Sequence, residues 1–179
     1  RYSNTGYLVL GLLLEQVTHN SLADNLRTTI FEPLGMRTAS LRRGSLPGAP
    51  MAHGYFLDED VTSQYIFGAS GGAVMTAPDV ARFFTGLFAG KVVSRRSLAA
   101  MTAQHSDVVL DWDGYGYGVA RRATDCGTAL GHSGRLDGYV TEAWTVPSRD
   151  VTVVVLANRG ENGGGGGVLG QFVDAALCG

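Results

Sequence analysis

Two short motifs, one at the start of the chain and one in its last third, carry side chains that could take part in acyl transfer. Tyr2-Ser3-Asn4 precedes an apolar segment, and Gly131-His132-Ser133-Gly134 lies where a short strand is expected. Acyl transfer needs a nucleophile, a group that takes its proton, donors for the oxyanion and a site for the charge of the substrate. Tyr2 could relay the proton if a nearby positive charge lowered its pKa, and the Asn4 amide can both donate and accept hydrogen bonds.

Both motifs also have a structural interpretation. Tyr2 can be a buried aromatic side chain and Asn4 a helix cap, because asparagine is common at that position. A single histidine is usually structural, but the glycines around His132 allow a ligand or another backbone to approach closely. The spacing Gly-His-Ser-Gly-x-x-x-Gly-Tyr, followed by a strand that contains Trp144, favours a site.

The sequence contains no serine nucleophile with a lysine partner. Lys91 is the only lysine, and Phe88 stands three residues before it, so there is no Ser-x-x-Lys. Ser3, Ser70 and Ser133 therefore lack the helical lysine that would activate them. We predict that this chain alone forms no stable acyl-enzyme.

Composition limits the classes of function. The 179 residues suffice for one domain or part of one, and 45% hydrophobic and 17% charged residues are typical of a folded globular chain. No apolar run reaches bilayer length, and the longest, residues 7–14, predicts a buried amphipathic helix. The net charge of −2 and scattered arginine pairs offer no clustered positive surface for nucleic acid. Cys126 and Cys178 lack metal-ligand spacing, so no metal site or cofactor is predicted, and either a disulfide or two buried thiols remain open.

Hydrophobic periodicity predicts helices first and strands afterwards. Helices are expected over residues 4–18, 21–30, 77–88 and 94–104, with N-caps at Asn4 or Thr5, Ser21, Thr76 and Ser94. Strands are expected over residues 114–120, 129–132, 138–146 and 151–158, and a helix over 168–177. The last two strands form a hairpin because Pro147-Ser148-Arg149-Asp150 is suited to a turn. The order predicts an α+β fold in which helices pack on an antiparallel sheet, with a mostly helical part at 1–112 and the strands and last helix at 113–179.

Further short motifs occur in the order found in a known family. They are Tyr2-Ser3-Asn4-Thr5, Ile30-Phe31-Glu32-Pro33-Leu34, His53-Gly54-Tyr55, Ser70-Gly71-Gly72-Ala73-Val74, Tyr115-Gly116-Tyr117-Gly118, Gly131-His132-Ser133-Gly134 with Gly138-Tyr139, Leu156-Ala157-Asn158 and Cys178-Gly179. Over essentially its whole length the chain resembles the later half of the secreted actinobacterial D-Ala-D-Ala carboxypeptidases, relatives of class C β-lactamases among the penicillin-recognising serine hydrolases. The resemblance implies a β-lactamase/DD-peptidase-like fold that is incomplete, with only part of the all-helical subdomain and without the Ser-x-x-Lys segment.

The resemblance also implies roles for individual residues. Tyr2 matches the proton-relay tyrosine, Asn4 the amide-binding asparagine and His132 the basic residue of the sheet motif, which is lysine in many relatives. Ser133 and Gly134 fall in the substrate-binding part of that motif, where the hydroxyl helps to bind the terminal carboxylate.

Further positions follow from the same resemblance. The backbone N–H of Arg135 matches the second oxyanion donor, and Phe67 is similar to an aromatic that lines the cleft. Cys126 and Cys178 match a disulfide of the carboxypeptidases, and the family implies a secreted protein.

The family's carboxylate-binding arginine falls on Ala120 in this sequence. Arg121 is no simple substitute, since neighbouring positions on a strand face opposite sides. We hypothesise that Arg135 replaces the lost arginine, because a guanidinium can bind a carboxylate through two hydrogen bonds.

The function implied is that of a serine hydrolase that acts on D-Ala-D-Ala peptides through an acyl-enzyme. Its expected ligands are peptidoglycan stem peptides or β-lactams, and its expected partner is a complementary N-terminal segment that carries Ser-x-x-Lys. A β-lactamase or esterase of the same fold and a catalytically silent binding protein remain alternatives, because a fold does not determine the substrate.

Overall fold

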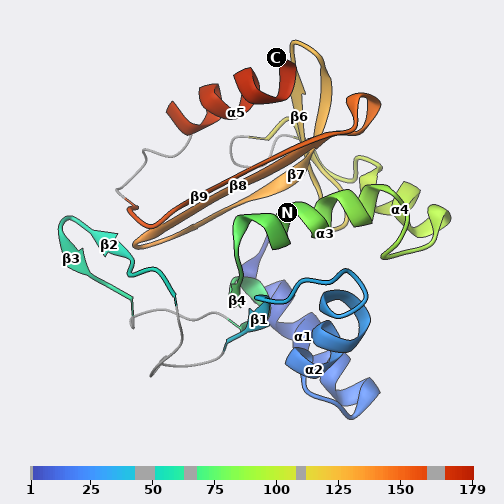
Figure 1. The fold of residues 1–179 in the computed structure, drawn as a ribbon. Coiled ribbons are helices and arrows are strands. Elements are labelled where there is room, and N and C mark those ends of the chain that lie inside the picture. Colours follow the sequence, from blue (N-terminus) through green and yellow to red (C-terminus); the bar gives the residue numbers. More distant parts are fainter. Residues whose placement is uncertain (1, 43–50, 63–67, 108–111, 161–167) are drawn as a thin grey trace.

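The chain folds around one antiparallel sheet with helices on both of its faces (Figure 1). The computed structural model describes residues 2–42, 51–62, 68–107, 112–160 and 168–179. Its α-helices are α1 (Asn4–Thr18), α2 (Leu22–Leu26), α3 (Ala77–Phe88), α4 (Arg95–Thr102) and α5 (Val168–Cys178). The sheet strands are β5 (Gly114–Tyr115), β6 (Ala120–Thr124), β7 (Gly127–Leu136), β8 (Tyr139–Val146) and β9 (Val151–Ala157). Two two-stranded ribbons join β1 (Ser40–Leu41) to β4 (Ala73–Val74) and β2 (Tyr55–Phe56) to β3 (Glu59–Asp60).

The large sheet has the strand order β5-β6-β7-β8-β9, and every neighbouring pair is antiparallel. The α+β prediction and the hairpin between the last two strands are therefore confirmed. In Figure 1, α5 covers one face of the sheet and α3 lies against the opposite face. The helices α1 and α2 lie beyond α3, away from α5.

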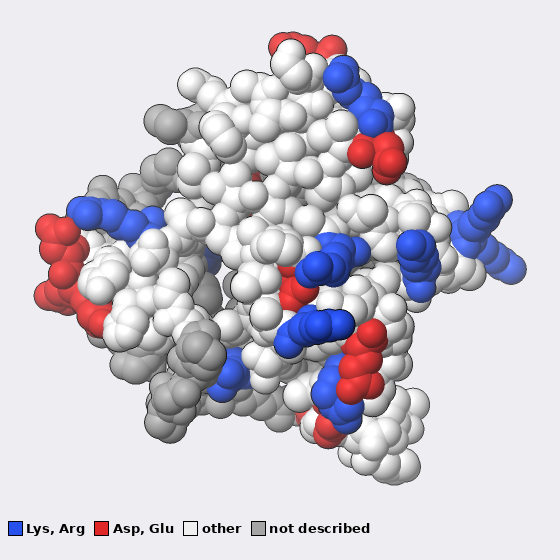
Figure 2. Space-filling model, viewed as in Figure 1, with Lys and Arg blue, Asp and Glu red and all other residues white. Residues whose placement is uncertain are grey.

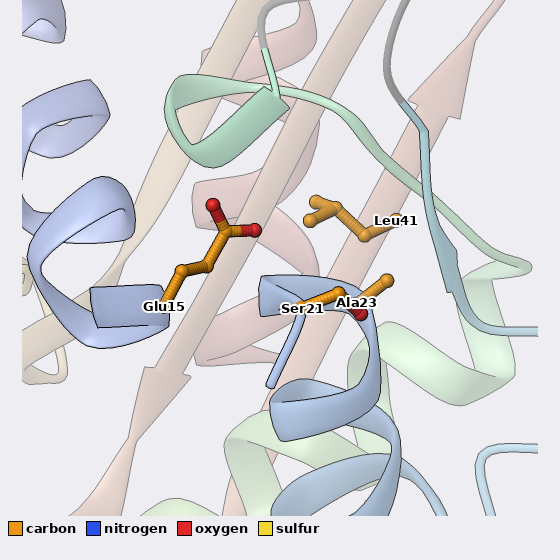
Figure 3. A pocket seen from close by; sticks show the side chains of 4 residues that line it. All are labelled: Glu15, Ser21, Ala23 and Leu41. Carbon is orange, nitrogen blue, oxygen red and sulfur yellow. The ribbon is translucent and has the colours of Figure 1, made fainter. Parts of the chain in front are cut away.

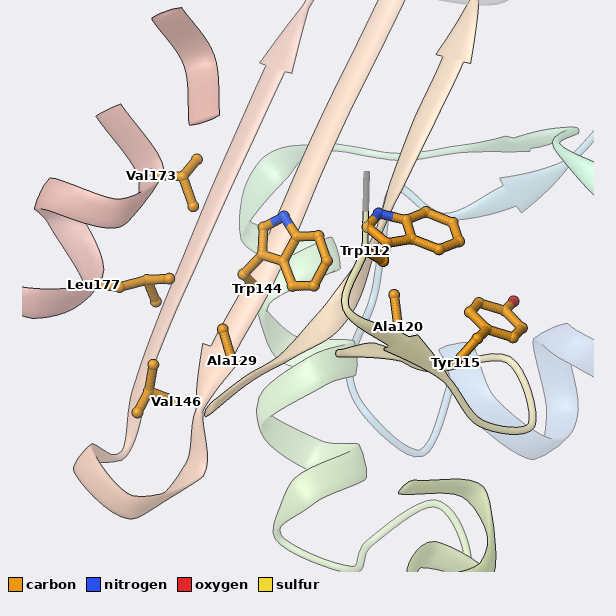
Figure 4. Close-up of a cluster of buried hydrophobic side chains, with 8 residues drawn as sticks. All are labelled: Trp112, Tyr115, Ala120, Ala129, Trp144, Val146, Val173 and Leu177. Atoms are coloured by element: carbon orange, nitrogen blue, oxygen red, sulfur yellow. The ribbon is translucent and has the colours of Figure 1, made fainter. Parts of the chain in front are cut away.

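The hydrophobic core lies between α5 and the sheet (Figure 4). Trp144 and Val146 of β8 pack there with Val173 and Leu177 of α5, and each of these side chains is almost completely buried. Burying a side chain of this size contributes about 1.5–3 kcal/mol, so this contact is a main source of stability. A disulfide joins Cys126, in the turn between β6 and β7, to Cys178 at the end of α5, and their Cα atoms are 5.4 Å apart.

The prediction that the first apolar run is a buried helix is wrong about burial. Within α1 only Gly11 is buried, where an added Cβ atom would lie 2.6 Å from Cβ of Ala69. Val9, Leu10, Leu12, Leu13 and Val17 are each more than half exposed. Apolar residues occupy most sides of this helix, whereas its main described contacts are with α2 and the turn Gly68–Ser70.

The predicted strand over 114–120 is two strands, β5 and β6, joined by a tight turn. Gly118 adopts φ +77° in this turn, and a Cβ atom on Gly116 would lie 1.9 Å from the Met101 carbonyl oxygen. Both positions therefore require glycine. By contrast, β7 is longer than predicted and runs to Leu136.

The predicted N-caps need two corrections. Ser3, rather than Asn4 or Thr5, caps α1 by accepting a 3.2 Å hydrogen bond from the Gly6 N–H. The Thr76 hydroxyl makes no cap bond to α3 and instead lies 3.0 Å from the Thr38 hydroxyl. The second predicted helix changes after α2 into a π-helical turn, Arg27–Phe31.

Among the described helices, none is long and apolar enough to cross a bilayer.

Candidate active site

The start of α1 places Tyr2 and Asn4 next to each other. The Tyr2 hydroxyl donates a 2.9 Å hydrogen bond to Oδ1 of Asn4, while the Ser3 cap fixes the first turn of the helix between them. Burial, and then the neighbouring Tyr7, raise the pKa of Tyr2 above its ordinary value. Tyr2 therefore stays protonated at neutral pH in the chain as described, because positive charge that would lower its pKa is not among the causes of the shift.

His132 lies on β7 with hydrogen-bond partners at both ring nitrogens. Its Nδ1 atom is bonded to the Ser133 carbonyl oxygen, and its Nε2 atom lies 3.1 Å from the Tyr115 hydroxyl. Burial lowers the pKa of His132, and the bond to the Ser133 carbonyl offsets part of that effect. The residue that the resemblance identifies as basic is therefore an uncharged imidazole at neutral pH.

Tertiary structure brings the two motifs together around the ring of Tyr2. The ring centroid of Tyr2 lies 6.0 Å from that of His132, 5.7 Å from that of Tyr115 and 6.0 Å from that of Trp112. Trp112 and Tyr115 stack on each other, with centroids 5.3 Å apart and planes 13° apart. Residues 2 and 132 are far apart in the sequence, and an aromatic cluster that packs on the hydrophobic core brings them together.

Sequence reasoning assigned no role to three members of this cluster, Tyr7, Trp112 and Tyr115. The Tyr7 and Tyr115 hydroxyls are 2.6 Å apart, so a row of hydrogen bonds leads from α1 through β5 to His132. Burial is the main cause that raises the pKa of Tyr115, followed by its bond with Tyr7. One signal was available for Tyr7, because it follows Asn4 by three residues and so lies on the same side of a helix.

The second motif lies on an open strand edge. Pairing of β7 with β6 ends at Gly131, opposite Ala120, whereas pairing with β8 continues to Leu136. No strand in the described part of the chain pairs with the other edge of residues 132–136. Ser133, Gly134 and Arg135 lie along this edge, where an extended peptide could bind by backbone hydrogen bonds.

Arg135 lies near a carboxylate of its own chain. Its Nη2 atom is 4.0 Å from Oε1 of the buried Glu142, whose Oε2 accepts a 2.6 Å hydrogen bond from Nε1 of Trp144. Alternation along β7 places Arg135 on the opposite face of the strand from His132. The Arg135 side chain is 38% exposed, so it can still meet a ligand from solvent.

The other positions considered for the carboxylate are occupied differently. Ala120 is completely buried in the core beside Tyr115 and Trp144. The Arg121 guanidinium donates a 2.7 Å hydrogen bond to the Thr102 carbonyl oxygen and so joins β6 to the end of α4. Phe67, predicted to line the cleft, lies outside the described residues.

Other surface features offer weaker candidates. On the face shown in Figure 2, basic side chains stand apart or beside acidic ones. A shallow hollow between α1, α2 and β1 is lined by Glu15, Ser21, Ala23 and Leu41 (Figure 3). Glu15 accepts a 2.8 Å hydrogen bond from the Leu22 N–H, so it has a structural role at the start of α2. Within the described ranges, no three His, Cys, Asp or Glu side chains gather as metal ligands.

Comparisons with known proteins identify the family and the fold of the chain. The family model described as Beta-lactamase matches residues 1–177. The chain is 27% identical to penicillin-binding protein 4* of Bacillus subtilis (strain 168), over 90% of this chain and 40% of the relative. It is 29% identical to penicillin-binding protein 4 of Amycolatopsis lactamdurans, over 89% of this chain and 47% of the relative.

A solved structure of similar fold is that of the D-amino acid amidase from Ochrobactrum anthropi SV3 with L-phenylalanine. It superposes with a TM-score of 0.82 at 25% identity, over 90% of this chain and 50% of the amidase. The chain thus spans half the length, or less, of the proteins it matches.

Proposed function

The chain belongs to the beta-lactamase family of serine hydrolases, and we propose that it forms the substrate-binding part of an acyl-transfer enzyme that acts on D-Ala-D-Ala peptides or β-lactams. The observation that carries the proposal is the meeting of Tyr2 and Asn4 with His132 beside the open edge of β7. Groups that relay a proton, bind an amide and accept an extended peptide are among the parts that acyl transfer requires besides the nucleophile.

The raised pKa of Tyr2 supports a nucleophile that is supplied by another segment. Burial keeps the pKa of Tyr2 high, whereas a proton relay needs a pKa nearer to neutrality. The lysine of a Ser-x-x-Lys segment, placed within about 4–6 Å, would lower the pKa of Tyr2 and activate the serine at the same time. We propose that a complementary N-terminal segment supplies both residues and that the chain alone is inactive.

An exposed apolar helix surface and an unpaired strand edge support the same partner. The exposed side chains of α1, Val9, Leu10, Leu12, Leu13 and Val17, form an apolar surface of a kind that marks an interaction site. The second feature is the outer edge of β9 (Val151–Ala157), whose backbone is paired with no other described strand. We propose that the segment packs a helix on α1 and adds a strand to β9.

The surroundings of the three positions considered for carboxylate binding favour a second substrate class. Ala120 is buried, the Arg121 guanidinium is bonded to Thr102, and Arg135 lies near Glu142. A substrate without a free carboxylate, such as a D-amino acid amide, would need none of them. The structural similarity to a D-amino acid amidase also supports this alternative.

The test joins this chain to an N-terminal segment of a family member that carries Ser-x-x-Lys. Fluorescent penicillin should label the complemented protein but not the chain alone, and a Ser→Ala change in the added segment should abolish labelling. Tyr2→Phe should slow labelling by at least the roughly 100-fold expected for loss of a proton-transfer group. Labelling of the isolated chain, or a folded complex that never labels, would refute the proposal.

Arg135→Ala distinguishes the two substrate classes. If Arg135 binds a carboxylate, the variant of the complemented protein should hydrolyse D-Ala-D-Ala peptides with a raised KM and D-amino acid amides as before. An unchanged KM for the peptides would reject the hypothesis that Arg135 replaces the lost arginine.

A further inference from the structure

The hydrogen-bond row Tyr7–Tyr115–His132 has a defined proton order. The Ser133 carbonyl oxygen can only accept, so the proton between it and His132 lies on Nδ1. In a neutral imidazole the other nitrogen accepts, and Nε2 therefore receives the Tyr115 O–H across 3.1 Å. With its own proton used, the Tyr115 oxygen accepts the Tyr7 O–H across 2.6 Å.

We propose that Tyr115 is a positioning residue that holds His132 in one orientation and one tautomer, protonated at Nδ1, with Tyr7 as the donor behind it. The geometry gives Tyr115 a second contact with the site, because its ring packs edge-on against the ring of Tyr2, with the planes 86° apart. One side chain therefore supports both His132 and Tyr2.

The row also opposes protonation of His132. An imidazolium would donate from Nε2, so Tyr115 would have to accept that bond and turn its own proton towards Tyr7. Every bond in the row would then reverse, at a buried position where reorganisation is costly. Burial lowers the pKa of His132 in the same direction.

The consequence for catalysis rests on the proposed function. An uncharged His132 leaves the positive charge beside Tyr2 to the lysine of the complementary segment. Tyr115 would thus keep His132 in an uncharged, structural role, while the lysine supplies the charge.

Nitrogen NMR of the ¹⁵N-labelled chain at neutral pH tests the proposal without any enzymatic activity. Wild-type His132 should show a proton on Nδ1 and an unprotonated Nε2 whose resonance is shifted by an accepted hydrogen bond. Tyr115→Phe should move the Nε2 resonance to the position of an unbonded nitrogen. Tyr7→Phe should move it in the same direction but less, because donation from Tyr7 strengthens the Tyr115 bond.

Tyr117→Phe is the matched control. Tyr117 is exposed and stacks on His105, at a centroid distance of 3.9 Å, so its loss should leave the His132 resonances unchanged. An Nε2 proton in the wild-type chain, or an unchanged Nε2 resonance in Tyr115→Phe, would overturn the proposal. If Tyr115→Phe fails to fold, the wild-type tautomer and the Tyr7→Phe shift decide the matter.

The two proposals fail separately. Absence of penicillin labelling in the complemented protein refutes the function but leaves the tautomer result intact. A wrong tautomer in a protein that does label refutes the role of Tyr115 only.

Discussion

Loss of the Cys126–Cys178 disulfide should lower stability by an amount that the structure allows to be calculated. The bond closes a loop with a sequence separation of 52 residues. In the chain-entropy treatment, a loop of this length contributes about 4 kcal/mol, because the cross-link restricts the unfolded chain. It also joins the end of α5 to the turn that leads into β7, so the core contacts of Leu177 and the strand that carries His132 depend on the same region.

The measurement compares the oxidised chain with the double variant Cys126→Ser/Cys178→Ser by thermal unfolding, followed by circular dichroism. Each kcal/mol shifts the Tm of a chain of this size by about 2–4 °C, so the expected decrease is about 8–16 °C. A reductant should lower the Tm of the wild-type chain and leave that of the variant unchanged. A decrease below about 3 °C, equivalent to about 1 kcal/mol, would refute the view that the disulfide holds α5 against the sheet.

Three further predictions concern single positions. Asp79 is buried, and although burial raises its pKa, hydrogen bonds from Thr38 and the Arg82 guanidinium lower the pKa below its ordinary value overall. Its stabilisation is therefore complete above the unfolded pKa of about 3.9 and is lost as the pH falls through the lower folded pKa. In urea titrations Asp79→Asn should lower the free energy of unfolding by about 1–3 kcal/mol at neutral pH, and this difference from wild type should shrink in acid. A difference in stability that is independent of pH would contradict this. Gly131→Ala should destabilise the fold by about 1–3 kcal/mol or more, because the added Cβ atom would lie 2.0 Å from the Ala143 carbonyl oxygen. In Gly134→Ala the added Cβ atom meets nothing closer than 3.6 Å, so the stability in the same titrations should change little. Equal effects of the two variants would contradict the β7–β8 geometry. Leu13→Gln on exposed α1 should change the stability of the isolated chain by less than about 0.5 kcal/mol, yet weaken its binding of the complementary segment in sedimentation experiments. A large loss of stability would mean that Leu13 is packed within the chain itself.

The sequence alone was sufficient for features that depend on neighbours along the chain. Helical spacing after residue 76 predicted α3. Alternating or continuous apolar runs in residues 138–146 and 151–158, with the turn between them, predicted the hairpin β8–β9. The order of the motifs identified the family, because each motif is local and keeps its place in the chain. Local patterns failed at Gly116 and Gly118, since glycine in an apolar run does not show whether the strand continues or turns.

Only the tertiary structure decided how the two motifs meet and what protonation state they have. The contact between Tyr2 and His132 depends on Trp112 and Tyr115, which the sheet and its core hold in place across more than a hundred residues of chain. Burial lowers the pKa of His132 and raises that of Tyr2. The exposure of α1 is likewise a tertiary property. An apolar helix has the same sequence whether its partner surface is present or not. The apolar pattern therefore predicted the helix but could not predict what covers it.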